Sequence, residues 1–341
     1  MRLAAAAVIL AWMSTALALP RGWIEGGYAN GLFADLNRAL VPAADRVPFA
    51  LSDVELLAVL AFFAAWTIRA RRRRVRWWRI GARAVACAAL GVALFEVLWG
   101  WNYRRIPVAE RVAYDESRVT AASVADFSRR VVGILNRDVA AAHAETLDRA
   151  RLEAAFAPIA ARLGDRWTVA VTAPKTTIFQ RYYDAAGIGG QYSPFSFETL
   201  LNASFLPFET PRALAHEWAH VAGFTGEGDA NYVATLACLR SEDALIRYSG
   251  AFWTYGDLPE AERRKLRLDP RVVADFRAAS ERFRRGYVPQ IFAVQWRFYD
   301  RYLRANNVAG GVASYGGFLK LLVGAPLDEA GLPVLRNAPP R

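Results

Sequence analysis

The segment His216-Glu217-Trp218-Ala219-His220 is the most informative stretch of this chain. It reads H-E-x-x-H and contains two of the three histidines in 341 residues. On a helix, side chains four residues apart share one face and lie about 6 Å apart, so both imidazoles can reach one metal ion. The glutamate between them can take a proton from a water molecule bound to that metal. The alternative is a surface helix that carries two solvated histidines.

The residues around this motif predict a helix that ends soon after it. Thr210 followed by Pro211 is typical of an N-cap and a first helical position. Three apolar residues recur at helical spacing and should face a core: Leu214, Trp218 and Val221. Gly223, three residues after His220, predicts the end of the helix and a tight turn that returns the chain toward the metal.

A catalytic zinc site has three protein ligands and leaves a fourth position for water. The next acidic residues are Glu227 and Asp229, and both should lie in the first turn of a second helix that continues to Leu239. Acids in a first turn also favour the helix dipole without any metal. Since no third histidine lies nearby in the sequence, we expect one of these two acids to complete the site.

Residues 216–238, HEWAHVAGFTGEGDANYVATLAC, resemble the core of a family of uncharacterised bacterial membrane proteins with a zincin-like domain. Three more segments resemble the same family: residues 99–105, 189–198 and 247–250. The E-x-x-A-N element at Glu227 resembles the one that carries the glutamate ligand of gluzincin peptidases, which favours Glu227 over Asp229. The chain departs from the pattern at Asp229, where a second glutamate is expected. The resemblance implies a membrane-anchored, zinc-dependent hydrolase and supplies no substrate.

Hydrophobic residues make up 54% of the chain and are concentrated in the first hundred positions. We therefore expect a membrane region over residues 1–102, with two or three transmembrane helices at about 3–20, 50–68 and 80–101. The first stretch could instead be a signal peptide, because Ala-Leu-Ala at residues 16–18 resembles a cleavage site. The apolar part of the second, residues 56–68, is short enough to favour a buried helix by length alone. Glu96 in the third is expected near the lipid headgroups, with burial against another helix as the alternative.

Eight arginines and no acid lie within residues 69–83, between the apolar parts of the second and third stretches. Subtracting eight charges from the net charge of +11 leaves +3, so the excess of basic residues is local. A nucleic-acid-binding surface is one interpretation. A cytoplasmic loop is the better one, because apolar stretches flank it on both sides. The sequence therefore predicts a multi-pass protein of the bacterial inner membrane, with no nucleic-acid partner and with the chain after Asn102 facing the periplasm or exterior.

Residues 103–341 should form one zincin-like domain of the α+β class, mostly helical with a small sheet. The predicted helices span residues 120–144, with Thr120 as cap, 146–163, and most of 260–321. The predicted strands span residues 167–172 and 176–179, followed by a loop and strand over 191–205. In zincin-like peptidases, an edge strand just before the metal helix pairs with an extended substrate. The third histidine, His143, has no H-x-x-x-H partner and should be structural or exposed.

These features predict a membrane-anchored, zinc-dependent hydrolase, and more specifically a metallopeptidase that acts on a peptide or protein, such as an envelope-associated one. His216, His220 and Glu227 would hold Zn²⁺, and Glu217 would be the general base. The alternative is a zinc-binding membrane sensor or scaffold that cleaves nothing. Glu217 argues against that alternative, because a structural site needs no base and usually has four protein ligands.

The tetrahedral intermediate of such a reaction also needs a hydrogen-bond donor for its oxyanion. Tyr248 is the first candidate, because it follows the second ligand helix, and Tyr192 and Tyr315 are alternatives. Each of these tyrosines is equally suited to packing. Asn231 or Asp243 would orient a ligand histidine.

Overall fold

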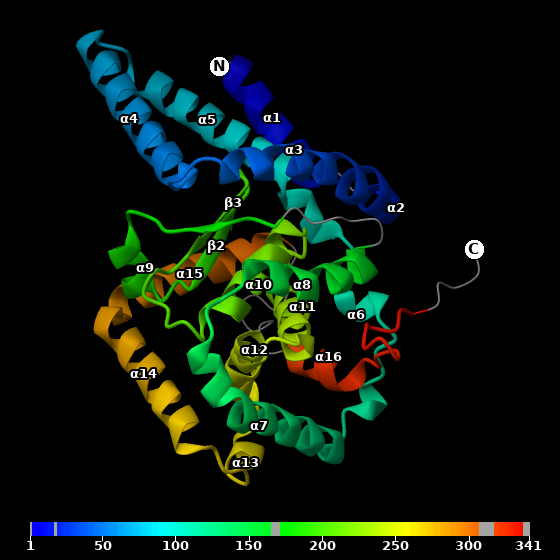
Figure 1. Ribbon diagram of the computed structural model, residues 1–341. Helices are drawn as coiled ribbons and strands as arrows, with labels where there is room; N and C mark the ends of the chain where they lie inside the picture. The colour runs from blue at the N-terminus through cyan, green and yellow to red at the C-terminus, as the bar shows by residue number, and fades with distance from the viewer. Residues whose placement is uncertain (1, 17–18, 165–170, 307–316, 337–341) are drawn as a thin grey trace.

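The computed structural model describes residues 2–16, 19–164, 171–306 and 317–336 (Figure 1). The helical elements are α1 (Arg2–Ala16), α2 (Arg21–Trp23), η1 (Ile24–Leu32), α3 (Phe33–Asp45), α4 (Leu51–Arg72), α5 (Trp77–Leu98), η2 (Gly100–Arg104), α6 (Val108–Arg111), η3 (Glu116–Arg118), α7 (Ala121–Ala144), α8 (Arg149–Gly164), α9 (Gln180–Ala186), α10 (Thr210–Val221), α11 (Glu227–Arg240), α12 (Ala244–Asp257), α13 (Glu260–Arg263), α14 (Pro270–Gly286), α15 (Pro289–Ala305) and α16 (Phe318–Gly324). The strands are β1 (Pro174–Lys175), β2 (Gly190–Ser193) and β3 (Glu198–Leu201). The described chain is therefore mostly helical with a small sheet, as the sequence predicts.

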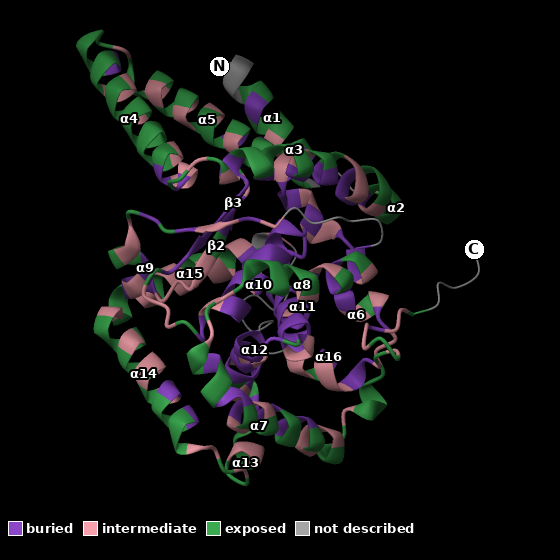
Figure 2. Ribbon diagram, in the orientation of Figure 1, coloured by how far each residue is buried: buried purple, intermediate pink, exposed green. Residues whose placement is uncertain are grey.

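Helices α4 and α5 form a hairpin that projects from the rest of the molecule (Figure 1). Both are 22 residues long and apolar enough to cross a membrane. Most of their side chains are exposed (Figure 2). The helix predicted at about 50–68 is confirmed as α4, which runs on to Arg72. The alternative of a buried helix at residues 56–68 is wrong, because the apolar stretch is part of a longer, exposed helix that begins at Leu51. The helix α1 packs alongside α5.

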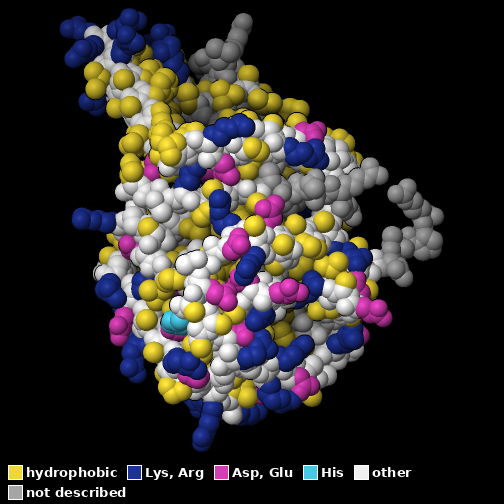
Figure 3. All heavy atoms as spheres, in the orientation of Figure 1, with side chains coloured by type: hydrophobic (Ala, Val, Ile, Leu, Met, Phe, Trp, Pro, Cys, Tyr) yellow, Lys and Arg dark blue, Asp and Glu magenta, His cyan; other side chains and the backbone are white. Residues whose placement is uncertain are grey.

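The arginine-rich segment lies at the free end of this hairpin. Figure 3 shows basic side chains gathered at the tip, above a shaft covered by hydrophobic ones. A helix of this length spans about 33 Å, close to the thickness of a hydrocarbon core of roughly 30 Å. The hairpin therefore separates its basic tip from the rest of the chain by about one membrane thickness.

The segment between the first two apolar stretches forms η1 and α3, which were not anticipated from the sequence. Tyr28 and Phe33 are fully buried, in the same apolar cluster as Trp218 of α10. Glu25 in η1 pairs with Arg105 and Arg111. These contacts attach η1 and α3 firmly to the part of the chain that follows the hairpin.

Buried helices occupy the centre of the large domain, where α10, α11 and α12 pack against one another (Figure 2). One apolar cluster surrounds Trp218, whose ring meets Phe156 of α8 edge to face. A second cluster lies between α7, α12 and α14. The predicted helix over residues 120–144 is confirmed as α7, and Thr120 forms a capping box with Ser123. The helix predicted over 146–163 is confirmed as α8, although it begins three residues later, at Arg149.

The sheet has the strand order β1-β3-β2, so β2 is an edge strand. Strand β1 is parallel to β3, and β2 is antiparallel to it and contacts α10. The strand predicted at residues 176–179 is wrong: these residues lead into α9. The reason is that the Asp53 carboxylate accepts hydrogen bonds from the Thr177 hydroxyl and the Ile178 N–H and so bends the chain there. Most of the other predicted strand, residues 167–172, falls outside the described residues.

Both ends of the hairpin are anchored on the domain. At the start of α4, the Glu198 carboxylate of β3 accepts hydrogen bonds from the backbone N–H groups of Leu51 (3.0 Å) and Ser52 (2.7 Å). It thereby caps a helix whose own N-cap residue has no capping side chain. At the end of α5, Glu96 is buried and lies 3.8 Å from Arg104. The structure therefore supports the alternative, burial of Glu96 within the protein.

Candidate metal centre

Helix α10 presents the H-E-x-x-H motif at the centre of the domain. Its N-cap is Glu209 rather than Thr210, one residue earlier than predicted. Its end is confirmed at Gly223, which adopts a left-handed conformation with φ of 76°. The backbone N–H groups of Gly223 and Phe224 return to carbonyls of the last helical turn, which closes a tight turn. This turn brings the start of α11 beside the histidines.

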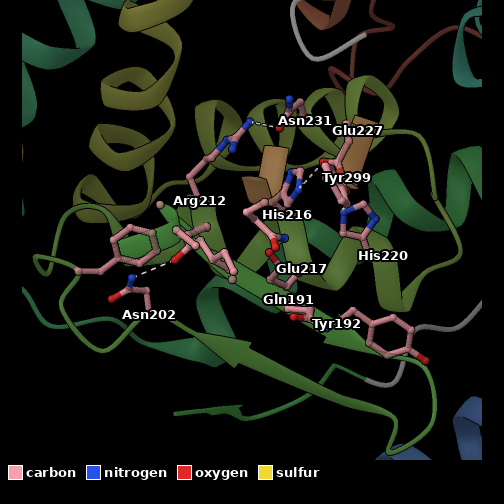
Figure 4. Close-up of a pocket in the computed structure, with 18 of the residues that line it drawn as sticks. Gln191, Tyr192, Asn202, Arg212, His216, Glu217, His220, Glu227, Asn231 and Tyr299 are labelled. Atoms are coloured by element: carbon pink, nitrogen blue, oxygen red, sulfur yellow. Dashed lines mark hydrogen bonds and ion pairs between the residues drawn. The ribbon is translucent and has the colours of Figure 1, made fainter. Parts of the chain in front are cut away.

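Three ligand atoms converge where α10 meets the first turn of α11 (Figure 4). His216 Nε2 lies 3.1 Å from one carboxylate oxygen of Glu227, and His220 Nε2 lies 3.6 Å from the other. The ligand atoms of the three residues all lie within 4.8 Å of one another. Two imidazoles and one carboxylate at this spacing suit a single zinc ion and leave a position for water.

The orientation of His220 is fixed by a backbone carbonyl. Its Nδ1 lies 2.8 Å from the Phe224 oxygen, which can only accept a hydrogen bond. Nδ1 therefore carries a proton, and Nε2 faces Glu227 and the metal position, where it would offer its lone pair to a bound metal. Such a bond to the far ring nitrogen is typical of histidines that bind metals.

Asp229, the other acid considered as third ligand, faces a different part of the molecule. Its carboxylate accepts a hydrogen bond from the Val108 N–H at 3.1 Å. Burial raises the pKa of Asp229 to about 6. With Arg105 and Arg111 it lines a second cavity of about 410 Å³. The structure thus brings Glu227, and not Asp229, to the two histidines.

Glu217 is buried and points from α10 toward the edge strand β2 (Figure 4). Its carboxylate accepts a hydrogen bond from the backbone N–H of Tyr192. A Cβ atom at Gly190 would lie 2.6 Å from Glu217 Oε1, so glycine is required for this close approach. Burial raises the pKa of Glu217 to about 7, a value that suits a general base near neutral pH.

The charges at the site favour the metal-binding form of two of the three ligands, His216 and Glu227. Burial lowers the pKa of His216 to about 4, which keeps this imidazole neutral. Burial opposes ionisation of Glu227, but the imidazoles of His220 and His216 hold its pKa well below the usual value. For His220, burial is outweighed by the Glu227 carboxylate, which raises the pKa to about 9. Metal binding would release the proton of His220.

A cavity of about 900 Å³ opens onto these residues. Helix α10 and strand β2 form one side of it. The end of α5 contributes Phe95 and Trp99, and α15 contributes Tyr299 and Tyr302. Its volume is that of a site for a ligand larger than a single amino acid.

The structure does not bring Tyr248 to this cavity. Tyr248 is fully buried in the second apolar cluster, and its hydroxyl donates a hydrogen bond to Asp275 of α14. The side chain of His143 is half exposed, and its Nε2 contacts the same carboxylate at 2.9 Å. Because Tyr248 lies in another apolar cluster and does not line the cavity, the prediction that it donates to an oxyanion is wrong.

Tyr299 is the tyrosine that the structure places beside the ligands. It comes from α15, and its hydroxyl donates a hydrogen bond to Glu227 (Figure 4). Of the other candidates, Tyr192 lines the cavity but its side chain is buried against Trp99. Tyr315 lies outside the described residues. The sequence offered no local signal for Tyr299, since it lies 72 positions from Glu227.

The two residues considered as orienting groups have other partners. Asn231 accepts a hydrogen bond of 2.6 Å from Arg212. Asp243 caps α12 by accepting from the Ile246 N–H, and it pairs with Arg151. Asp243 therefore stabilises the start of α12 instead of a ligand histidine.

The segment that follows the hairpin is hydrogen-bonded to the end of α10. The Trp99 indole N–H donates to the His220 carbonyl, and Arg105 donates to the Ala222 carbonyl, both at 3.1 Å. The bond from Arg105 satisfies a carbonyl that the helix itself leaves open, and the bond from Trp99 is a second one to a carbonyl that also accepts from the Gly223 N–H. Asn102 also crowds Gly223, where a Cβ atom would lie 2.9 Å from its side-chain oxygen. The segments 99–105, 189–198 and 216–238 thus meet at one site.

Comparison with known proteins gives a family match and no further relative. Residues 28–323 match the model of a family described as a protein of unknown function (DUF3810). The match runs from η1 through the hairpin to α16 and covers most of the chain. No curated protein and no solved structure matches the chain.

Proposed function

The chain belongs to the DUF3810 family, and we propose that it is a membrane-anchored, zinc-dependent hydrolase, specifically a metallopeptidase of zincin-like type. The observation that supports this most is the convergence of His216, His220 and Glu227 on one point of a large cavity, with Glu217 beside them. Three protein ligands with a neighbouring buried carboxylate are typical of catalytic zinc, whereas structural zinc usually has four protein ligands.

The chemistry would be divided among few residues. A bound zinc ion would supply a Lewis acid that polarises the scissile carbonyl. Glu217 would take the proton of the attacking water and return it to the leaving amine. Tyr299, in place of Tyr248, would donate its hydroxyl to the oxyanion. The edge of β2 that faces away from β3 would align an extended peptide beside Glu217 through backbone hydrogen bonds.

The test of this proposal is a zinc and cleavage measurement on the purified full-length chain in detergent. We expect about one zinc ion per chain and cleavage of a mixed peptide library. A chelator should remove both, and added zinc should restore both, because the base has no activated water without the metal. A chain that binds zinc and cleaves no peptide would favour the sensor or scaffold alternative. A chain without zinc would contradict the proposal.

We also propose that the hairpin crosses the bacterial inner membrane with the zinc site outside the cytoplasm. The arginine-rich tip and the domain lie at opposite ends of α4 and α5, and basic loops remain in the cytoplasm. A topology reporter inserted after Arg76 should therefore be cytoplasmic, and one fused after Arg341 should be external. If protease protection puts both reporters on the same side, the hairpin does not span the membrane.

A further inference from the structure

Arg212 is a buried guanidinium in the wall of the cavity that contains the zinc ligands. It precedes His216 by four residues on α10, so both side chains lie on the same helix face (Figure 4). Its side chain lines the cavity, although only 8% of the residue is exposed. A positive charge is therefore held one helical turn from the first zinc ligand.

The groups that hold Arg212 are neutral. Nη2 donates to the Asn231 amide oxygen at 2.6 Å, and Nε lies 3.5 Å from the Thr235 hydroxyl. The guanidinium carbon lies 5.6 Å from the centre of the Trp253 ring. Asp257 lines the same cavity, yet in the described part of the chain no carboxylate lies within 4.0 Å of the Arg212 guanidinium.

This arrangement is unusual because buried charges are generally paired. The other arginine of the cavity follows the rule: Arg282 of α14 donates from Nη2 to one oxygen of Glu209 at 2.8 Å, and its Nε lies 2.8 Å from the other oxygen. The two arginines differ in that, among the described residues, a carboxylate lies within 4.0 Å of Arg282 and none lies within 4.0 Å of Arg212. An anionic group of a bound ligand would complete the ion pair that Arg212 lacks.

We propose that Arg212 binds a carboxylate of the substrate and selects peptides that carry one close to the cleaved bond. This rests on the proposed function in that the cavity is taken to be the substrate site. A planar guanidinium matches a carboxylate through two parallel hydrogen bonds. One helical turn is about 5.4 Å and one extended residue about 3.5 Å, so the carboxylate should lie within about three residues of the cleaved bond. It belongs either to the peptide C-terminus or to an Asp or Glu side chain.

The test measures binding, so that it does not depend on cleavage. Full-length Glu217→Gln protein is immobilised and equilibrated with N-acetylated tetrapeptides that are supplied in matched pairs. One pair differs only in a C-terminal carboxylate or carboxamide. The other pair differs only in an internal Glu or Gln. Mass spectrometry of the retained peptides should show carboxylates enriched about 10- to 100-fold over the matched amides, the range for a buried charged hydrogen bond. If the C-terminal carboxylate is enriched over the carboxamide, Arg212 binds the peptide C-terminus. If internal Glu is enriched over Gln, Arg212 binds a side-chain carboxylate.

Arg212→Gln, added to the same protein, should abolish this enrichment, and Arg212→Lys should keep part of it because charge remains without the planar fork. Arg282→Gln is the matched control and should keep the enrichment, since Arg282 is already neutralised by Glu209. Zinc content and thermal midpoint report whether each variant is folded. If Arg212→Gln does not fold, the proposal is tested by Arg212→Lys, which should show a lower enrichment of carboxylates than the parent protein.

The inference is overturned if acids and amides are retained equally, if no peptide is retained, or if folded Arg212→Gln or Arg212→Lys selects acids as strongly as the parent does. These outcomes differ from failure of the hydrolase proposal. If the wild-type chain cleaves nothing while carboxylate-selective binding depends on Arg212, the hydrolase proposal fails and the assignment of Arg212 stands.

Discussion

Glu217→Gln should lower the turnover of a cleaved peptide by about 10²–10⁴-fold, the usual effect of losing a positioned general base. Glutamine has the same shape and can still accept the hydrogen bond from the Tyr192 N–H, but it cannot take a proton from water. Zinc should remain bound, because Glu217 is not one of the three converging ligand residues. The measurement is steady-state kinetics on a peptide from the library, with metal analysis of the same samples.

Asp257→Asn is a suitable control for this substitution. Asp257 lines the same cavity, but it is not among the grouped ligands. Its replacement should leave both zinc and turnover largely intact. If Glu217→Gln turns over peptide as fast as the wild type does, Glu217 is not the base. If it restores the phenotype of a deletion strain fully, the protein acts by binding rather than by hydrolysis.

The part of the site that could be predicted from the sequence is the part encoded by local spacing. The helical periodicity around Trp218, the stop at Gly223 and the two acids after it lie within a short stretch. The turn at Gly223 is closed by bonds between neighbouring residues, so it needs no distant element. For this reason the sequence alone predicts the helix that contains His216 and His220 and the start of the next helix.

The groups that complete the cavity come from distant segments and have no local pattern. Tyr299 reaches Glu227 only because α15 folds back over the site, and Tyr248 follows the ligand helices in sequence yet points into another cluster. Arg212 could have been placed on the ligand face by its spacing from His216. Its lack of a carboxylate partner, however, depends on side chains from α11 and α12.

The helices between the first two apolar stretches were missed for a different reason. Gly22, Gly26, Gly27 and Gly31 lower the intrinsic helix propensity of residues 21–32, so the local sequence gives little sign of a helix there. Burial of aromatic side chains in the core outweighs that cost in the folded protein. Propensity is a weak guide where tertiary packing of this size is available.

Glu227→Gln should remove most of the zinc, as should His216→Ala and His220→Ala, since each leaves only two of the three protein ligands. A carboxamide is a much poorer zinc ligand than a carboxylate, although it fills the same space, so packing around α11 should be preserved. Metal analysis after dialysis and a zinc competition titration measure the effect. Loss of zinc should also abolish peptide cleavage, because Glu217 then has no activated water to deprotonate.

Asp229→Asn is the matched control for Glu227→Gln. Both substitutions exchange a carboxylate in the first turn of α11 for an amide of the same shape; Glu227 is buried and Asp229 is half-buried. Asp229 accepts a hydrogen bond from the Val108 N–H, which an asparagine oxygen can still accept, so its loss of charge should leave zinc binding intact. If Asp229→Asn loses zinc while Glu227→Gln keeps it, the third ligand is Asp229 and the start of α11 must be arranged differently. If both variants and both histidine variants keep zinc, the metal lies elsewhere in the chain.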